Sequence, residues 1–129
     1  MAIKFNDLEE AFTAMRNTPP DAILMVSDAL MTLNRKRVFE FAAARRLPAI
    51  YEYDPLVREG GLMSYGPDLR ESFERAAVLA ERIFKGAKAG DLPFEQPTRY
   101  LFVININRAK AIGLDIPPTV LALADQVIE

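Results

Sequence analysis

Apolar residues recur along the chain at two spacings, one typical of helices and one typical of buried strands. The first helical pattern comprises Leu8, Ala11, Phe12 and Met15, and Asn6 lies before it at the position of an N-cap. Four shorter apolar runs bounded by turn residues are typical of buried strands. These runs lie near residues 22–27, 48–52, 61–65 and 99–105.

Helical patterns separate these strands. One helix is expected over residues 33–46, with Val38, Phe41 and Ala42 on its inner face. The longest helix is expected to begin near Pro67 and to end at Gly86, with intrahelical pairs Glu71–Arg75 and Glu81–Lys85. A short helix from about Arg108 stops at Gly113, and a last helix follows Pro117-Pro118. The alternation predicts one α/β domain over residues 1–129, a three-layer Rossmann-like fold with a mostly parallel sheet.

The carboxyl ends of the first three strands carry the candidate binding residues, because ligands of open parallel sheets lie beyond those ends. The residues are Ser27 and Asp28, Tyr51 and Glu52, and Ser64 and Tyr65. Hydroxyls, carboxylates and aromatic rings at one edge suit a small molecule with polar and apolar parts. The alternative is that Ser27 and Asp28 cap a helix and that the tyrosines fill the core.

The amino-acid composition excludes several classes of catalytic and binding site. The chain has no cysteine and no histidine, which removes Cys–His and Ser–His catalysis and the usual zinc sites. A net charge of −2, from 16 basic and 18 acidic residues, gives no basic surface for nucleic acid. The pair Glu52 and Asp54 has no visible partner for acid–base work. We therefore expect no metal, no cofactor and no catalysis.

Two other features have simpler interpretations. Gly60-Gly61 and Gly86 with Gly90 lack the pattern of a phosphate-binding loop and are explained by turns and a helix stop. The basic residues of positions 35–37 and 45–46 point in all directions around their helix, which is typical of a solvated surface.

Six segments taken in order resemble the C-terminal portion of ABC-transporter substrate-binding proteins of the tryptophan/tyrosine-uptake-like group. They are LPAIYE (47–52), GGLMSYG (60–66), IFKGAK (83–88), DLPFEQP (91–97), VININRAKAIGL (103–114) and IPP (116–118). The resemblance covers essentially the whole chain. It implies a partial type I periplasmic-binding fold, in which two lobes close over a solute such as an aromatic or branched amino acid and dock on an ABC permease. The same six residues are then the expected cleft residues.

The resemblance also sets expectations for assembly and location. It implies that the chain crosses to the other lobe near Ser64–Gly66 and later crosses back. The fragment would expose an apolar stripe on the longest helix (Leu69, Phe73, Ala77, Ala80 and Phe84) and would form a homodimer, for example by exchanging the segment after Gly66. A truncated remnant that self-associates and binds no solute is the alternative function, and a small hydrolase is a third. The family implies a periplasmic location, but residues 1–7 lack the apolar core of a signal peptide, so the chain as written would stay cytoplasmic.

Overall fold

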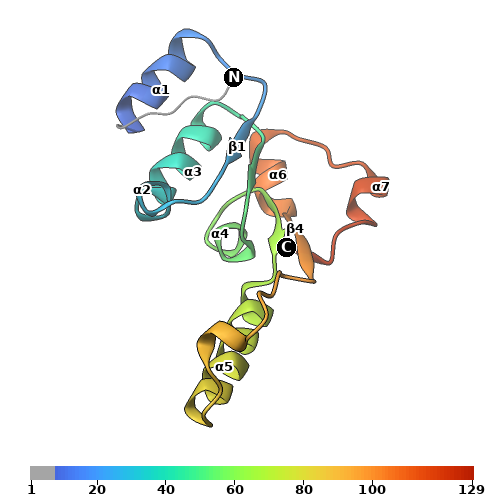
Figure 1. Ribbon diagram of the computed structural model, residues 1–129. Helices are drawn as coiled ribbons and strands as arrows, with labels where there is room; N and C mark the ends of the chain where they lie inside the picture. Colours follow the sequence, from blue (N-terminus) through green and yellow to red (C-terminus); the bar gives the residue numbers. More distant parts are fainter. Residues whose placement is uncertain (1–7) are drawn as a thin grey trace.

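A five-stranded sheet forms the centre of the molecule (Figure 1). The computed structural model describes residues 8–129, and the strands lie in the order β1-β2-β3-β4-β5. Their bounds are β1 Ile23–Met25, β2 Ala49–Tyr51, β3 Met63–Pro67, β4 Tyr100–Asn105 and β5 Gln126–Ile128. The first three strands are parallel to one another, β4 is antiparallel to β3, and β5 is parallel to β4. The mostly parallel α/β sheet expected from the sequence is confirmed.

Within residues 8–129, α1 precedes the sheet and six further α-helices lie between successive strands. Their bounds are α1 Leu8–Asn17, α2 Ala29–Leu33, α3 Arg35–Ala44, α4 Asp54–Arg58, α5 Leu69–Phe84, α6 Ile106–Ile112 and α7 Pro118–Leu121, with a 3₁₀ turn, η1, at Ala89–Asp91. In Figure 1, α1, α2 and α3 gather near β1, while α6 and α7 lie near the opposite end of the sheet. Helix α5 and the chain that returns from it extend away from the rest of the molecule.

The strand predictions are accurate for four strands and incomplete for the fifth. All four predicted runs contain a strand, with bounds that differ by a few residues. Strand β5 was missed, because the sequence pattern predicted only a helix after Pro117-Pro118 and that helix ends at Leu121. Strand β4 is the strand that runs antiparallel to its neighbour β3. It follows a long excursion through α5, and its pairing of Pro67 with Tyr100 joins the departing and returning chain segments as antiparallel neighbours.

The helix expected over residues 33–46 is present as α3, and a short helix that was not predicted, α2, lies just before it. Asp28 caps α2, which ends before Asn34, and α3 begins at Arg35. Val38 and Ala42 are buried as expected, but Phe39 rather than Phe41 completes the buried set of α3. Phe41 instead stacks on Phe12 of α1, with ring centroids 4.5 Å apart. The predicted N-cap at Asn6 lies outside the described residues.

The long helix α5 begins at Leu69, two residues after the predicted start near Pro67. Pro67 ends β3, and the Asp68 side chain accepts a hydrogen bond from the backbone N–H of Arg70 at 2.9 Å as the N-cap. Gly86 has a φ of 102°, so it stops the helix as expected. Lys85 pairs with Glu81 at 2.7 Å, as predicted. Arg75 does not pair with Glu71 and instead binds Glu95 of the returning chain.

The core is built on the sheet and not on α5. One cluster joins α1, α3 and the first two strands, and it includes Phe12, Met25, Val38, Phe39 and Tyr51. A second cluster joins Leu62 and Ile104 to the buried residues of α6 and to Ile116. A smaller cluster places Val57 of α4 against Leu101 and Val103 of β4. These clusters hold the carboxyl ends of β1, β2 and β3 at one edge.

Candidate functional site at the carboxyl edge of the sheet

The ends of β1 and β2 meet through one hydrogen bond. The backbone N–H of Ser27 donates to Oε2 of Glu52 at 3.0 Å, although the two residues are 25 positions apart. This contact fixes the carboxylate just beyond the strand ends. Partial burial and the Glu52 carboxylate raise the pKa of the neighbouring Tyr53 above its ordinary value. The structure therefore brings together Ser27 and Glu52, as the topology of parallel strands predicts.

Asp28 follows directly and has a local structural role. Its Oδ1 accepts a hydrogen bond from the backbone N–H of Met31 at 2.7 Å, which makes it the N-cap of α2. The alternative interpretation, in which Asp28 caps a helix, thus agrees with the hydrogen bond that its side chain makes. Asp28 is exposed and directly follows Ser27 at the carboxyl end of β1.

Tyr51 lies in the core. It is 1% exposed, and its ring meets Phe39 edge-on with centroids 5.2 Å apart. Burial raises the pKa of Tyr51 to about 12, partly offset by the charge of Arg108, so the phenol stays protonated at neutral pH. The tyrosine at this strand end therefore supports the position of β2 against α3 from within the protein.

Ser64 is buried completely. Its Oγ has no hydrogen-bond partner among the described residues, and the same holds for Oγ of Ser27. An unpaired buried hydroxyl costs about 1–3 kcal/mol of stability, so these two serines are unusual positions at the ends of β1 and β3.

Tyr65 points to the surface and belongs to a group of aromatic rings. It is 59% exposed, stacks on Tyr100 with centroids 5.8 Å apart, and meets Phe102 edge-on at 6.4 Å. The pairing of β3 with β4 places Phe102 directly opposite Tyr65. Sequence reasoning did not include Tyr100 or Phe102. Their alternate spacing in the fourth strand was the available signal, but the antiparallel neighbour was needed to place them.

Gly66 brings the end of β3 against the end of β2. A Cβ atom at this position would lie 1.8 Å from the carbonyl oxygen of Glu52. Only glycine allows this approach of the two backbones. The residue therefore holds Tyr65 and Glu52 at neighbouring positions of the edge.

A cavity of about 680 Å³ opens at the same edge, between α4 and the base of α5. Residues of both charge signs line it, and they pair with each other: Asp54 with Arg58 at 3.1 Å, Asp68 with Arg99 at 3.8 Å, and Arg70 with Glu74 at 3.0 Å. Leu69, Leu101 and Pro55 add apolar surface. None of the six predicted residues lines this cavity, although Asp54 and Asp68 follow the predicted strand ends by two and three residues.

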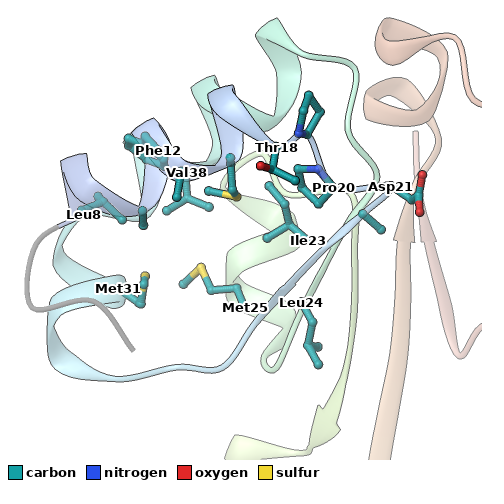
Figure 2. Close-up of a pocket in the computed structure, with 15 residues that line it drawn as sticks. Leu8, Phe12, Thr18, Pro20, Asp21, Ile23, Leu24, Met25, Met31 and Val38 are labelled. Carbon is teal, nitrogen blue, oxygen red and sulfur yellow. The ribbon is translucent and has the colours of Figure 1, made fainter. Parts of the chain in front are cut away.

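A second cavity, of about 500 Å³, lies between α1 and β1 (Figure 2). Its lining is mostly apolar and includes Leu8, Phe12, Ile23, Met25, Met31 and Val38. Asp21 is its one charged lining residue among those that the structure describes. This cavity suits an apolar group, whereas the cavity beside α4 offers partners for a charged one.

No group of three or more Asp, Glu, His or Cys side chains within residues 8–129 is arranged to hold a metal ion. Over the same residues, every helix is too short or too polar to cross a bilayer.

The sheet and its polar carboxyl edge define a class of α/β proteins that hold small molecules beyond their strand ends. The chain belongs to the ABC transporter substrate binding protein family, whose sequence model matches residues 1–128. No curated protein matches it. The expected ABC substrate-binding family and the expected mostly parallel α/β fold are thus confirmed.

Three solved structures show the same fold. An ABC domain from Streptococcus pneumonia in complex with L-Trp is 28% identical, with a TM-score of 0.84 over 95% of this chain and 41% of that chain. A conserved domain protein from Vibrio cholerae is 25% identical, with a TM-score of 0.85 over 98% and 42%. A ligand-free, open substrate binding protein with adhesive properties from Clostridium difficile is 18% identical, with a TM-score of 0.63 over 100% and 43%. The chain therefore spans about two-fifths of the length of each.

Proposed function

We propose that the chain is the solute-binding component of an ABC importer, or a part of one, and that it holds a small molecule such as an amino acid for delivery to a membrane permease. The family match over residues 1–128 is the observation that carries this proposal. The family is one of binding proteins, which favours binding over catalysis for this chain. Its relatives work outside the cytoplasm, and we propose the same location for the protein that contains this sequence.

The proposed solute lies at the carboxyl edge, and its polar head is held from the side of α4. The paired charges of the cavity there can separate to hold an ammonium and a carboxylate, one of each sign. Asp28 and the carboxylate of Glu52, which accepts a hydrogen bond from Ser27, add acceptors at the ends of β1 and β2. A zwitterion such as an α-amino acid matches this set of groups.

The apolar part of the solute is proposed to stack on Tyr65. Tyr65, Tyr100 and Phe102 lie on the face of the sheet opposite Leu101 and the α4 cavity, so the proposed solute reaches around the strand ends from one face to the other. Tyr65 and Tyr100 are both half exposed and stacked, so they present ring faces to a third planar group. An aromatic side chain fits such a surface, and the similar protein from Streptococcus pneumonia carries L-Trp. Tyr51 and Ser64 contribute from the core, by setting the positions of β2 and β3.

Calorimetric titration of the chain with the common amino acids tests this proposal. An aromatic amino acid is expected to bind, and Tyr65→Ala is expected to weaken binding about tenfold through the loss of one stacked ring. Phe94→Ala is the control, since Phe94 is fully exposed and lies in the segment that returns from α5. Equal binding by the parent chain and by Tyr65→Ala would contradict the assignment of the stacking surface.

Self-association without solute binding is the second candidate, and the exposed apolar surface of α5 favours it. No residue of this helix is buried, and Phe73, Val78, Ile83 and Phe84 are exposed. We infer that the chain forms a homodimer in either case. If no amino acid binds and the chain is still dimeric, this second candidate replaces the first.

A further inference from the structure

Glu52 is a carboxylate at the carboxyl edge that has no positively charged partner within residues 8–129. It directly follows Tyr51, the last residue of β2, and it is half-buried. None of the ion pairs between described residues includes it. A half-buried carboxylate without a cation has lost part of its hydration and has gained no ion pair in return, so it favours the arrival of a positive group.

The other carboxylates near this edge already have structural roles. Asp54 and Asp68, which line the cavity beside α4, each lie close to an arginine, at 3.1 Å and 3.8 Å. Asp28 is exposed and accepts the hydrogen bond that caps α2. An ammonium that entered the cavity would have to displace an arginine from its carboxylate, whereas at Glu52 it would meet a carboxylate with no cation beside it.

The Glu52 carboxylate is held in a fixed place. The backbone N–H of Ser27 donates to its Oε2 at 3.0 Å, and Gly66 packs so closely that a Cβ there would lie 1.8 Å from the carbonyl oxygen of Glu52. The first contact fixes the side chain from the end of β1, and the second fixes the main chain from the end of β3. A carboxylate accepts up to about four hydrogen bonds, so the contact with Ser27 leaves acceptor sites for a ligand.

The hydroxyl of Ser27 supplies an unpaired polar group beside this contact. Its Oγ is buried and has no hydrogen-bond partner in the described part of the chain, although the N–H of the same residue binds Glu52. Buried polar atoms are rarely left without a partner in folded proteins. A carboxylate and a hydroxyl together suit an ammonium, because its N–H groups need several acceptors.

We propose that Glu52 binds the positively charged group of the solute and thereby restricts the protein to solutes that carry an ammonium. This inference rests on the function proposed above and assigns one contact within it. Tyr65 precedes Gly66, so the ring that would stack the apolar part of the solute lies at the neighbouring strand end. An acid of the same shape without an ammonium is rejected, because it leaves Glu52 unpaired and brings a second negative charge to the same edge.

Calorimetric titration of the chain with a matched series tests this contact. The series is L-tryptophan, tryptamine, which keeps the ammonium alone, and indole-3-propionate, which keeps the carboxylate alone. The parent chain is expected to bind indole-3-propionate least tightly. Glu52→Gln should weaken L-tryptophan and tryptamine about tenfold to a hundredfold and leave indole-3-propionate unchanged or more tightly bound. Glutamine keeps an acceptor for the Ser27 N–H, so thermal unfolding should show that the variant retains its fold.

Glu40→Gln is the control, because it removes one negative charge from an exposed position in α3 and should leave all affinities unchanged. Equal affinity of the parent chain for L-tryptophan and indole-3-propionate would overturn this inference alone. The same holds if Glu52→Gln changes no affinity, or weakens the whole series equally, since solute binding would then stand without a charge contact at Glu52. A parent chain that binds neither L-tryptophan nor tryptamine would overturn both this inference and the aromatic amino acid as the solute.

Discussion

Helix α1 beside the sheet and the α5 excursion have similar amphipathic patterns but very different burial. Residues of α1 and α3 such as Phe12, Val38 and Phe39 are buried against β1 and β2. Helix α5 has a longer and equally regular apolar stripe, yet none of its residues is buried. The comparison shows that an apolar stripe on a helix indicates only that some other surface covers it. Whether the partner lies in the same chain depends on where the connections lead the helix.

The largest expected difference between the two regions is in the effect of removing one large apolar side chain. Ile104 is fully buried in the centre of the sheet, so Ile104→Ala is expected to lower the free energy of unfolding by about 2–5 kcal/mol. Phe84→Ala should change it by less than about 0.5 kcal/mol at concentrations low enough to dissociate a dimer. Urea unfolding of both variants measures this, and similar losses would erase the contrast.

Glycine substitutions should likewise change the stability of the protein more in the sheet than in the α5 excursion. Gly66→Ala drives a methyl group into the backbone of Glu52, and we expect a loss of about 1–3 kcal/mol or more from the displaced strand. Gly90 has open space around its Cα in the segment after α5, so Gly90→Ala should be neutral or stabilise by up to about 1 kcal/mol. Thermal unfolding compares the two. An unaffected Gly66→Ala would mean that the ends of β2 and β3 are not closely packed.

Alkaline pH should weaken the sheet through Tyr51. Its pKa is raised in the folded state to about 12 from 10.0, so the folded protein retains a proton that the unfolded chain loses. The contribution of this phenol is therefore complete below pH 10 and is lost between pH 10 and 12, by up to about 2–3 kcal/mol. The difference in stability between the parent chain and Tyr51→Phe isolates this effect. It should be constant below pH 9, and a constant difference up to pH 12 would contradict a buried phenol.

The smallest expected effect concerns two serines. Ser64→Ala removes a buried hydroxyl that has no partner among residues 8–129, so it should be neutral or stabilise by up to about 1 kcal/mol. Ser72 of α5 donates its hydroxyl to the backbone oxygen of Asp68 at 3.1 Å, and Ser72→Ala should cost about 0.5–1 kcal/mol. Chemical unfolding resolves the opposite signs. A clear loss of stability for Ser64→Ala would show that the Ser64 hydroxyl has a hydrogen-bond partner.

The location of the candidate site could be predicted from the sequence, but most of the contacts between its residues could not. The parallel order of β1, β2 and β3 brought Ser27 and Glu52 into contact, as their strand-end positions predicted. The sequence did not show whether each tyrosine side chain points into the core or to the solvent, because Tyr51 and Tyr65 both occur in apolar runs with short polar neighbours. Tyr51 lies under α3, whereas Tyr65 is open and stacks on Tyr100, a residue of a strand 35 positions later. The mixed-charge cavity was missed because α4 and α5 form it jointly.

The sequence by itself determined four of the five strands described, most helices and their stops, since these depend on local spacing, caps and glycines such as Gly86 and Gly113. It also determined the family, through an ordered series of segments along the chain. The tertiary structure decided the direction of β4, the existence of β5, and the separation of α5 from the core. These features depend on which distant segments pair, and a three-residue strand such as Gln126–Ile128 is stable only because β4 offers it a ladder of backbone groups.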